Sequence, residues 1–144
     1  MLYTRRDLCR YGAALAALAA AGPSLSWASE GEDAVKAAIM AFTGGVMPAE
    51  GGVEIGAPEI AENGSTVPVQ VAAEGASSIL LLASRNPNPD VATFHFGALA
   101  GSSFASTRIR LAETQDLVAV AKMADGSFQM ASRNVKVTIG GCGG

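Results

Sequence analysis

The sequence predicts a mainly β protein: an antiparallel β-sandwich of immunoglobulin-like form, with a short helix before it and a flexible glycine-rich arm after it. Two observations lead to this fold class. Beyond Gly45 the apolar residues follow a period of two, and clusters of turn-forming residues separate the segments. Seven or eight short strands in about 100 residues are typical of a two-sheet sandwich. A β-barrel is the alternative, and the 144 residues allow one domain.

Residues 32–42 are predicted to form the helix. Val35, Ile39 and Phe42 recur at i, i+4 and i+7, so they make one apolar stripe. Acidic residues occupy the first turn and a glycine pair follows the end, in agreement with the helix dipole and C-cap preferences. We expect this stripe to cover a core and to have no cofactor role.

The predicted strands alternate between apolar and polar side chains. They are 53–60, 66–72, 78–84, 91–96, 104–112, 116–123, 127–131 and 135–139. Turn signals separate several of them, at 63–65, 86–89 and 125–126. Pro68 falls inside one strand, and because proline cannot donate a ladder hydrogen bond, that strand is predicted to lie at a sheet edge.

The first 28 residues are predicted to be a twin-arginine export signal, which leaves a domain of residues 29–139. Arg5 and Arg6 precede a nearly unbroken run of small apolar residues from 12 to 21, and Ser26-Trp27-Ala28 offers small residues where signal peptidase reads them. An uncleaved membrane anchor is the alternative, but the run is well short of the ~20 residues that span a bilayer. We therefore expect a periplasmic protein without a membrane anchor.

The charge balance argues against nucleic acid as a partner. The chain has 10 basic and 13 acidic residues, and removing the signal takes away three arginines and one aspartate. Seven basic and 12 acidic residues remain, a net charge near −5. No basic stripe is left, and aromatic residues are too few for a base-stacking surface.

Cys142 is the only cysteine that remains once the signal, with Cys9, is removed. No internal disulfide is then possible in an oxidising compartment, and an odd cysteine indicates an intermolecular bond or a reactive thiol. Residues 140–144 are predicted to form a swinging arm, because glycine barely limits φ and ψ and adds no girth. Five extended residues reach roughly 17 Å. The arm glycines are Gly140, Gly141, Gly143 and Gly144.

The arm contains no group that would activate its own thiol. The thiolate is the nucleophile, and its pKa stays near about 8.5 unless a cation, a metal or a helix N-terminus lowers it. The nearest cation in sequence is Lys136, while the terminal carboxylate two residues from Cys142 disfavours ionisation. We expect other enzymes to activate the sulfur, so the protein is predicted to be a covalent carrier and not an enzyme.

The body of the chain offers few chemical groups. His95 is the only histidine and is predicted to lie on an exposed strand face, so neither a metal site nor a cofactor is expected. Arg108 and Arg110 share one strand face, where two guanidiniums could hold an anion or pair with acidic residues of a partner. Solvated side chains or local ion pairs are the alternative.

Residues 135–144, Val-Lys-Val-Thr-Ile-Gly-Gly-Cys-Gly-Gly, resemble the C-terminus of SoxY, a family of the periplasmic thiosulfate-oxidising Sox system. The resemblance extends to 86–89, 92–96, 106–112 and 118–121. It implies the same sandwich fold and implies that Cys142 is oxidatively joined to thiosulfate. It further implies that other Sox enzymes oxidise the sulfane sulfur and release sulfate, and that the protein forms a heterodimer with a SoxZ-like subunit.

Two other functions stay open. A ubiquitin-like sulfur carrier also ends in Gly-Gly, but it uses the terminal carboxylate as a thiocarboxylate in the cytoplasm. The export signal and Cys142 argue against it. The second alternative is a structural β-domain that dimerises through Cys142.

Overall fold

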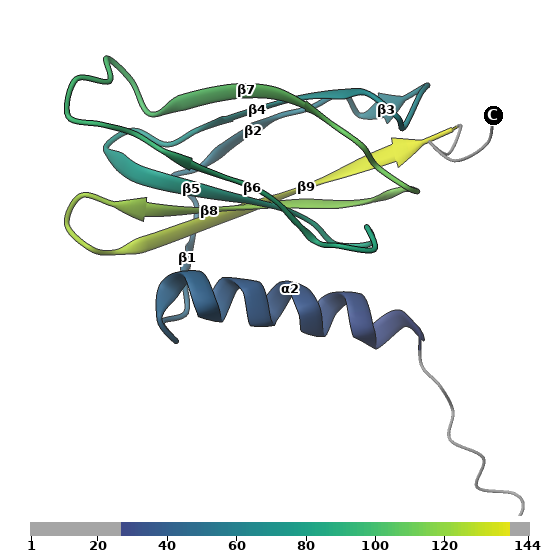
Figure 1. Ribbon diagram of the computed structural model, residues 1–144, viewed down its shortest axis with the longest axis horizontal. Helices are drawn as coiled ribbons and strands as arrows, with labels where there is room; N and C mark the ends of the chain where they lie inside the picture. The colour runs from purple at the N-terminus through teal and green to yellow at the C-terminus, as the bar shows by residue number, and fades with distance from the viewer. Residues whose placement is uncertain (1–26, 139–144) are drawn as a thin grey trace, which may run out of the picture.

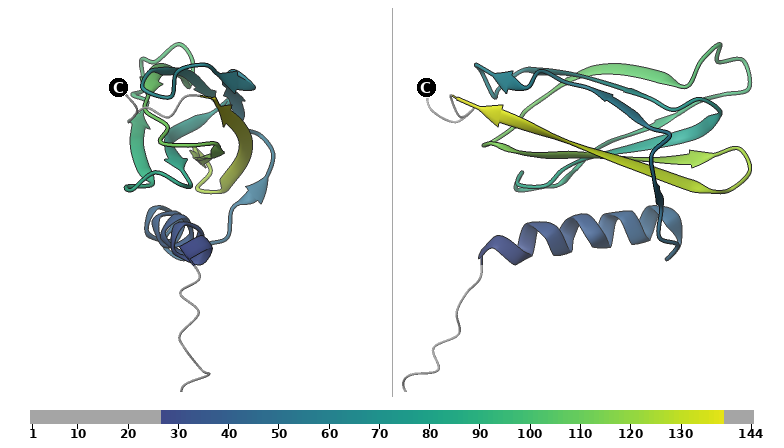
Figure 2. Two further views of the ribbon diagram at one scale, coloured as in Figure 1. Left: turned by 90° about the vertical axis from the view of Figure 1, so that its right-hand side faces the viewer. Right: turned by 180° about the vertical axis from the view of Figure 1, so that it is seen from behind.

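The computed structural model of the protein describes residues 27–138, with side chains from residue 31 onward. These residues form one helix and nine strands in three layers (Figure 1). Helix α2 covers the outer face of a larger sheet, and a smaller sheet packs on the opposite face of that sheet (Figure 2). The prediction of a mainly β protein with one N-terminal helix is confirmed, whereas its immunoglobulin-like form stays a prediction.

Helix α2 spans Trp27–Thr43 and is longer than the predicted 32–42 at its N-terminal end. The predicted stripe faces the larger sheet: Val35 and Ile39 are buried there, with Phe42 packed beside them. The chain leaves the helix through Gly44 and Gly45, whose φ angles are 69° and 91°. These left-handed values are where glycine is favoured after a helix end.

The larger sheet has the strand order β1-β9-β8-β5-β6, and β3 pairs with β9 beside this path. Strands β1 and β3 are parallel to β9, while the other pairs are antiparallel. The strands are β1 (Ala49–Glu50), β3 (Ile60–Ala61), β5 (Ala76–Ala83), β6 (Asp90–His95), β8 (Gln115–Met123) and β9 (Phe128–Val137).

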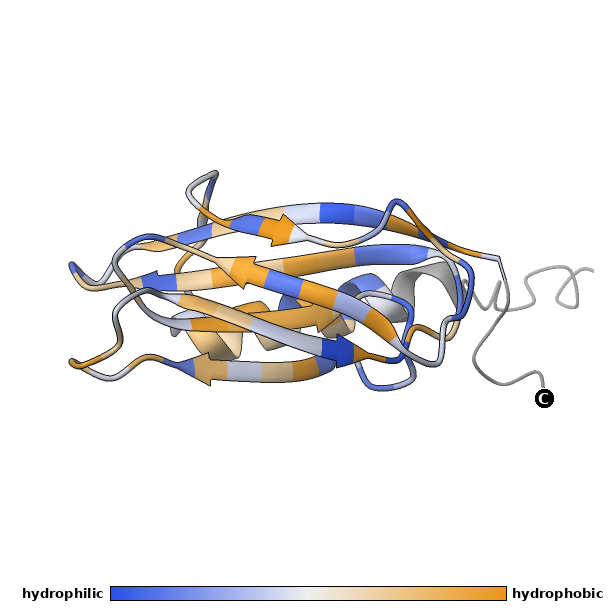
Figure 3. Cartoon of the chain, turned by 90° about the horizontal axis from the view of Figure 1, so that it is seen from above, coloured by the Kyte–Doolittle hydropathy of each residue, from blue (hydrophilic) through white to orange (hydrophobic). Residues whose placement is uncertain are grey.

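The smaller sheet is antiparallel, with the order β2-β4-β7. Its strands are β2 (Glu54–Gly56), β4 (Val67–Ala72) and β7 (Phe104–Ile109). Hydrophilic and hydrophobic residues interchange along the strands (Figure 3), because one face turns toward the other sheet and one toward solvent. The alternating inward residues of both sheets form the main core, and the two sheets are separate, unlike the alternative barrel.

The predicted strand 53–60 is wrong as a single element. The structure divides it into β2, which pairs with β4, and β3, which pairs with β9. Between them Ala57 and Pro58 carry the chain from one sheet to the other, and Pro58 has no N–H to donate to either ladder. Periodicity alone could not show this crossing, because both halves alternate in the same way.

The predicted strands 127–131 and 135–139 are one continuous strand, β9. Ser132, Arg133 and Asn134 interrupt the apolar pattern, yet all three pair with β8 and are exposed. A polar run therefore continues a strand here, since the ladder to β8 satisfies the backbone without help from apolar side chains.

The prediction that Pro68 marks an edge strand is wrong, since β4 is the middle strand of its sheet. The local pairing explains how proline is tolerated. Strand β2 pairs only with residues 70–72 of β4, so at Pro68 the only strand in register is β7, through Arg108. Missing donors are tolerated where a neighbouring strand has ended.

Candidate functional site

The residues predicted to carry the function lie at the two ends of the chain. Arg5, Arg6 and the whole predicted arm, 140–144 with Cys142, lie outside the described residues. The structure does describe the segment that leads to the predicted arm, residues 136–138, which we call the arm root. The site is therefore built from the arm root and the side chains around it.

The arm root is hydrogen-bonded along both of its edges. On one edge, the N–H of Lys136 donates to the carbonyl of Glu59 at 3.0 Å and that of Thr138 donates to Ala61 at 3.1 Å. On the other edge, the N–H of Val137 donates to Oγ1 of Thr114 at 2.9 Å. The chain that precedes the predicted arm is thus held from both sides through Thr138.

A buried polar network supports the loop that bears Thr114. Gln115 is only 2% exposed, and its Oε1 accepts a bond from the N–H of Arg85 at 2.8 Å. Its Nε2 donates to Oδ1 of Asn86 at 2.9 Å and to the carbonyl of Glu113 at 3.1 Å. Buried amides are stable only with such partners, so this network fixes residues 113–115 against the β5–β6 loop.

Asn86 extends the same network toward β7. Its Nδ2 donates to the carbonyl of Arg110 at 2.7 Å, and its Oδ1 also accepts from the N–H of Ala112 at 3.0 Å. Residues 86–89 were predicted as a turn and formed part of the family resemblance, but Thr114, Gln115 and Asn86 were not predicted to form a connected set. One signal was present: Gln115 stands in line with the inward-facing Leu117 and Ala119, where an amide needs a buried partner.

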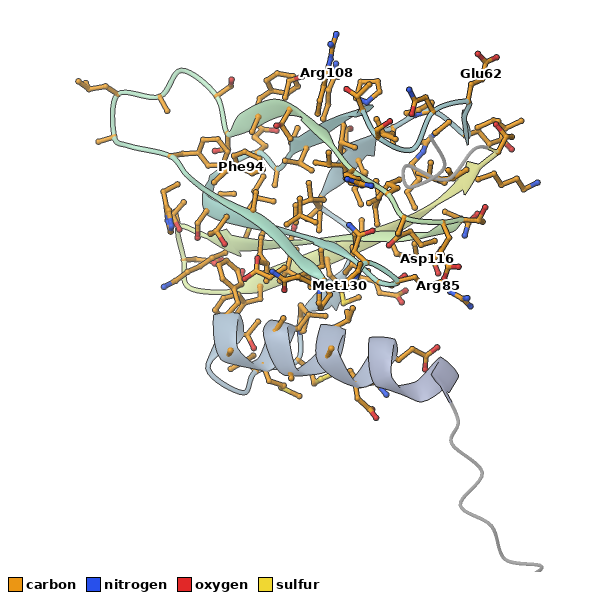
Figure 4. All side chains as sticks on the ribbon, turned by 45° about the vertical axis from the view of Figure 1, so that its right-hand side comes forward. Glu62, Arg85, Phe94, Arg108, Asp116 and Met130 are labelled. Carbon is orange, nitrogen blue, oxygen red and sulfur yellow. The ribbon has the colours of Figure 1, made fainter. Side chains whose placement is uncertain are left out.

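Charged side chains of both signs lie at this end of the domain, and carboxylates predominate in one cavity there. Glu62, Arg85 and Asp116 lie at the same end as the last residues of β9 (Figure 4). Arg85 approaches Glu113 at 3.4 Å, with both side chains more than half exposed. A cavity of about 530 Å³ opens between the start of α2 and the β5–β6 loop, and its lining includes Glu32, Glu113 and Asp116 beside Arg85. Three carboxylates against one paired guanidinium make it a poor site for an anion.

The two arginines of β7 and its continuation are placed as the alternation predicted. Arg108 lies on the exposed face of β7 with Phe104 and Ser106, and its side chain points away from the domain in Figure 4. Arg110 is exposed as well and has an interaction partner of its own. Thr107 and Ile109 occupy the inward face. The backbone of Arg110 joins the network described above, because its carbonyl accepts the bond from Nδ2 of Asn86.

The remaining titratable groups within residues 31–138 include His, Asp and Glu side chains, which are possible metal ligands. His95 is exposed on β6, as predicted. In that part of the chain no three His, Cys, Asp or Glu side chains come together as metal ligands. No helix among the described residues is long and apolar enough to cross a membrane. Asp125 has a lowered pKa, because the Ser127 hydroxyl and then its N–H donate to the carboxylate, and it lies in the β8–β9 hairpin.

Comparison with known proteins shows to which class of protein this chain belongs. Residues 39–142 match the family model of sulfur oxidation protein SoxY. The structure is similar to that of the sulfur carrier protein SoxY from Chlorobium limicola f thiosulfatophilum, with 39% identity, a TM-score of 0.65, and coverage of 75% of this chain and 99% of that one. The fold and these matches define a sulfur carrier protein. The chain belongs to the SoxY family, and the resemblance predicted from its last ten residues is confirmed.

Two other similarities concern the fold alone. Superoxide reductase (neelaredoxin) from Ignicoccus hospitalis has 16% identity and a TM-score of 0.54, covering 60% of this chain and 80% of that one. A putative superoxide reductase from Thermotoga maritima has 14% identity and a TM-score of 0.52, covering 68% and 91%. No curated protein matches the chain.

Proposed function

We propose that this protein carries sulfur intermediates of thiosulfate oxidation covalently on Cys142 while partner enzymes process them. The observation that carries the proposal is the family match, which extends through residue 142 and so includes the only cysteine left after the predicted signal. The similar protein from Chlorobium limicola is a sulfur carrier protein, which supports the same role here. Gly140, Gly141, Gly143 and Gly144 act as the arm that presents the sulfur.

Attachment of thiosulfate to Cys142 is an oxidation, and we propose that a partner enzyme carries it out. Joining the thiol of Cys142 to the outer sulfur of thiosulfate forms one S–S bond and releases one proton and two electrons. The partner must therefore be a redox enzyme that accepts two electrons. The cavity between the start of α2 and the β5–β6 loop has a mainly acidic lining, which would repel thiosulfate. This charge favours a carrier whose sulfur is activated elsewhere, by enzymes of the Sox system.

The proposal also covers how the protein is exported and with which subunit it pairs. The protein is exported by the twin-arginine route through Arg5 and Arg6, loses residues 1–28, and works in the periplasm with a SoxZ-like subunit. Twin-arginine export passes folded proteins, so a folded pair could cross together when only one chain carries a signal. Arg108 is a candidate contact for acidic residues of a partner, because it is exposed on the outer face of the smaller sheet, opposite the side that α2 covers.

Intact mass of the protein purified from the periplasm separates this function from its alternatives. Thiosulfate-derived adducts on Cys142 that a reductant removes support the carrier. A C-terminal thiocarboxylate supports the ubiquitin-like carrier. A disulfide dimer without any sulfur adduct supports the structural domain. The Cys142→Ser protein is the matched control and should carry no adduct.

Fractionation tests the export proposal separately. In cells that express this chain and its partner, Arg5→Lys with Arg6→Lys should leave both subunits in the cytoplasm. Finding the partner in the periplasm while this chain stays behind would contradict export as a pair, and would leave the carrier function in place.

A further inference from the structure

The backbone ladder between β8 and β9 ends before the arm root. Its last pair is Gln115 with Val135, two residues short of Val137. Beyond that pair the β8 side offers no strand residue, because β8 begins at Gln115. An unsupported strand end frays readily. Something other than the ladder therefore has to hold Val137 on this edge.

The side chain of Thr114 takes the place of the missing backbone partner. Its Oγ1 accepts the hydrogen bond from the N–H of Val137 at 2.9 Å, and the hydroxyl is 3.4 Å from the carbonyl oxygen of the same residue, to which it donates. A backbone residue in an antiparallel pair exchanges the same two bonds. One hydroxyl thus continues the ladder by one residue pair toward the arm.

Strand β3 closes the opposite edge over the same residues. Ile60 is in register with Lys136 and Ala61 with Val137, and the Oγ1 of Thr138 lies 3.4 Å from the carbonyl of Ala61. This parallel pairing comes from a strand of only two residues, so it is weak by itself. The arm root is held because β3 and Thr114 act on it from both sides.

We infer that Thr114 is a positioning residue that sets where the arm begins and hence how far Cys142 can reach. This inference rests on the proposed carrier function. With the root held through Thr138, Cys142 is four positions further along the chain, a span of at most about 14 Å when extended. Releasing Val137 and Thr138 adds two residues, or about 7 Å. A longer tether lowers the effective concentration of the sulfur at a partner's active centre and adds chain entropy that docking must remove.

The substitution Thr114→Val tests this inference. Valine keeps the shape of threonine and removes the hydroxyl, and the site is exposed, so no buried group is lost from the core. Thr114→Ser keeps the hydroxyl and should behave as wild type. The matched control is Thr93→Val on β6, an exposed threonine whose strand pairs with β5 and not with β9.

Two measurements on the full mature chain are needed. The first is amide hydrogen exchange at Val137 and Thr138, whose protection should fall about tenfold in Thr114→Val and stay unchanged in the other two variants. The second is the rate of thiosulfate adduct formation in a reconstituted Sox system, by intact mass. Loading at limiting enzyme should fall about three- to tenfold in Thr114→Val. Reaction of Cys142 with a small thiol reagent should not change, because that reaction needs no docking.

The possible outcomes separate a failure of this inference from a failure of the proposed function. Unchanged exchange at Val137 and Thr138 would overturn the inference, as would increased exchange with loading at the wild-type rate. Equal losses in Thr114→Val and Thr114→Ser would also overturn it, because the hydroxyl would then have no role. A wild-type chain that takes up no sulfur at all would instead contradict the proposed function, whatever the exchange measurement shows, and Thr114 would then have no delivery to position.

Discussion

The two ends of the domain are tied together in different ways. At the arm-root end, side chains bridge segments that are 23 to 30 residues apart, as in the bonds of Thr114 and Gln115. At the opposite end (Figure 1), the β8–β9 hairpin closes through Asp125 and Ser127, two residues apart, and the β6–β7 loop exposes Leu99 completely. The arm-root end joins its distant segments through one buried amide, that of Gln115, whereas the opposite end combines local turns with single side-chain bonds such as that of Ser103 to the carbonyl of Ala76.

The difference between the two ends agrees with their roles in the proposed function. A chain that presents a reactive group needs a fixed starting point, because an uncertain origin spreads the group over a larger volume. The opposite end has no such demand in the proposed function, so local turns and single side-chain bonds are sufficient there. The long-range network therefore stabilises the segment that leads to Cys142.

The largest effect on stability is expected from Gln115→Leu. Leucine fills a similar volume, but it leaves the N–H of Arg85 without its acceptor and Asn86 with one bond fewer. The free energy of unfolding should fall by about 2–4 kcal/mol, as measured by urea denaturation. Ser103→Ala, which removes one bond to the carbonyl of Ala76 at the opposite end, should cost about 1 kcal/mol. Equal losses would mean that the two ends are tied equally strongly.

A second contrast comes from glycine substitutions at the two ends. Gly141→Val with Gly143→Val should slow partner-catalysed loading by at least about tenfold, because β-branched residues stiffen and widen the arm near the sulfur. Gly97→Val with Gly101→Val is the control, since an added Cβ at either position meets no atom within 4 Å. Reaction with a small thiol reagent should change little in both proteins. No loss of loading in the arm variant would show that the arm does not enter a narrow channel.

The smallest effect is a pH dependence at the β8–β9 hairpin. Hydrogen bonds from Ser127 lower the pKa of Asp125 in the folded protein, so the charged carboxylate favours folding. This stabilisation is present above the unfolded pKa of about 4 and is lost as the pH falls through the lower, folded value. Asp125→Asn should therefore melt slightly below wild type near about pH 6, and the gap should close near about pH 2. A gap that widened in acid would show that the carboxylate does not act in this way.

The sequence predicted the elements whose pattern is local. Strands near 66–72, 78–84, 91–96 and 116–123 lie within two residues of β4, β5, β6 and β8, because alternation in β4 and the short apolar runs of β5 and β8 between turn signals are local patterns. The exposed position of Arg108 followed from the same alternation. The division of 53–60 between two sheets did not follow, since it depends on partners about 15 and 75 residues away along the chain.

The site was predictable only in part, for a similar reason. The cysteine between two glycine pairs can be recognised in the sequence alone, and it led to the family that the comparisons confirm. Thr114 carries no such mark, because threonine is common at strand ends and its role depends on the distant Val137. A polar residue acquires such a role only through its partners, which one sequence does not reveal.

The most direct test of the carrier function is thiosulfate-dependent turnover by the Cys142→Ser protein in a reconstituted Sox system. Serine cannot form the S–S bond, so turnover should be abolished. Circular dichroism and the melting temperature should match those of wild type, because Cys142 follows the last strand in the sequence and lies in the predicted arm. A serine variant that folds normally and keeps more than trace turnover would contradict covalent carriage on this residue.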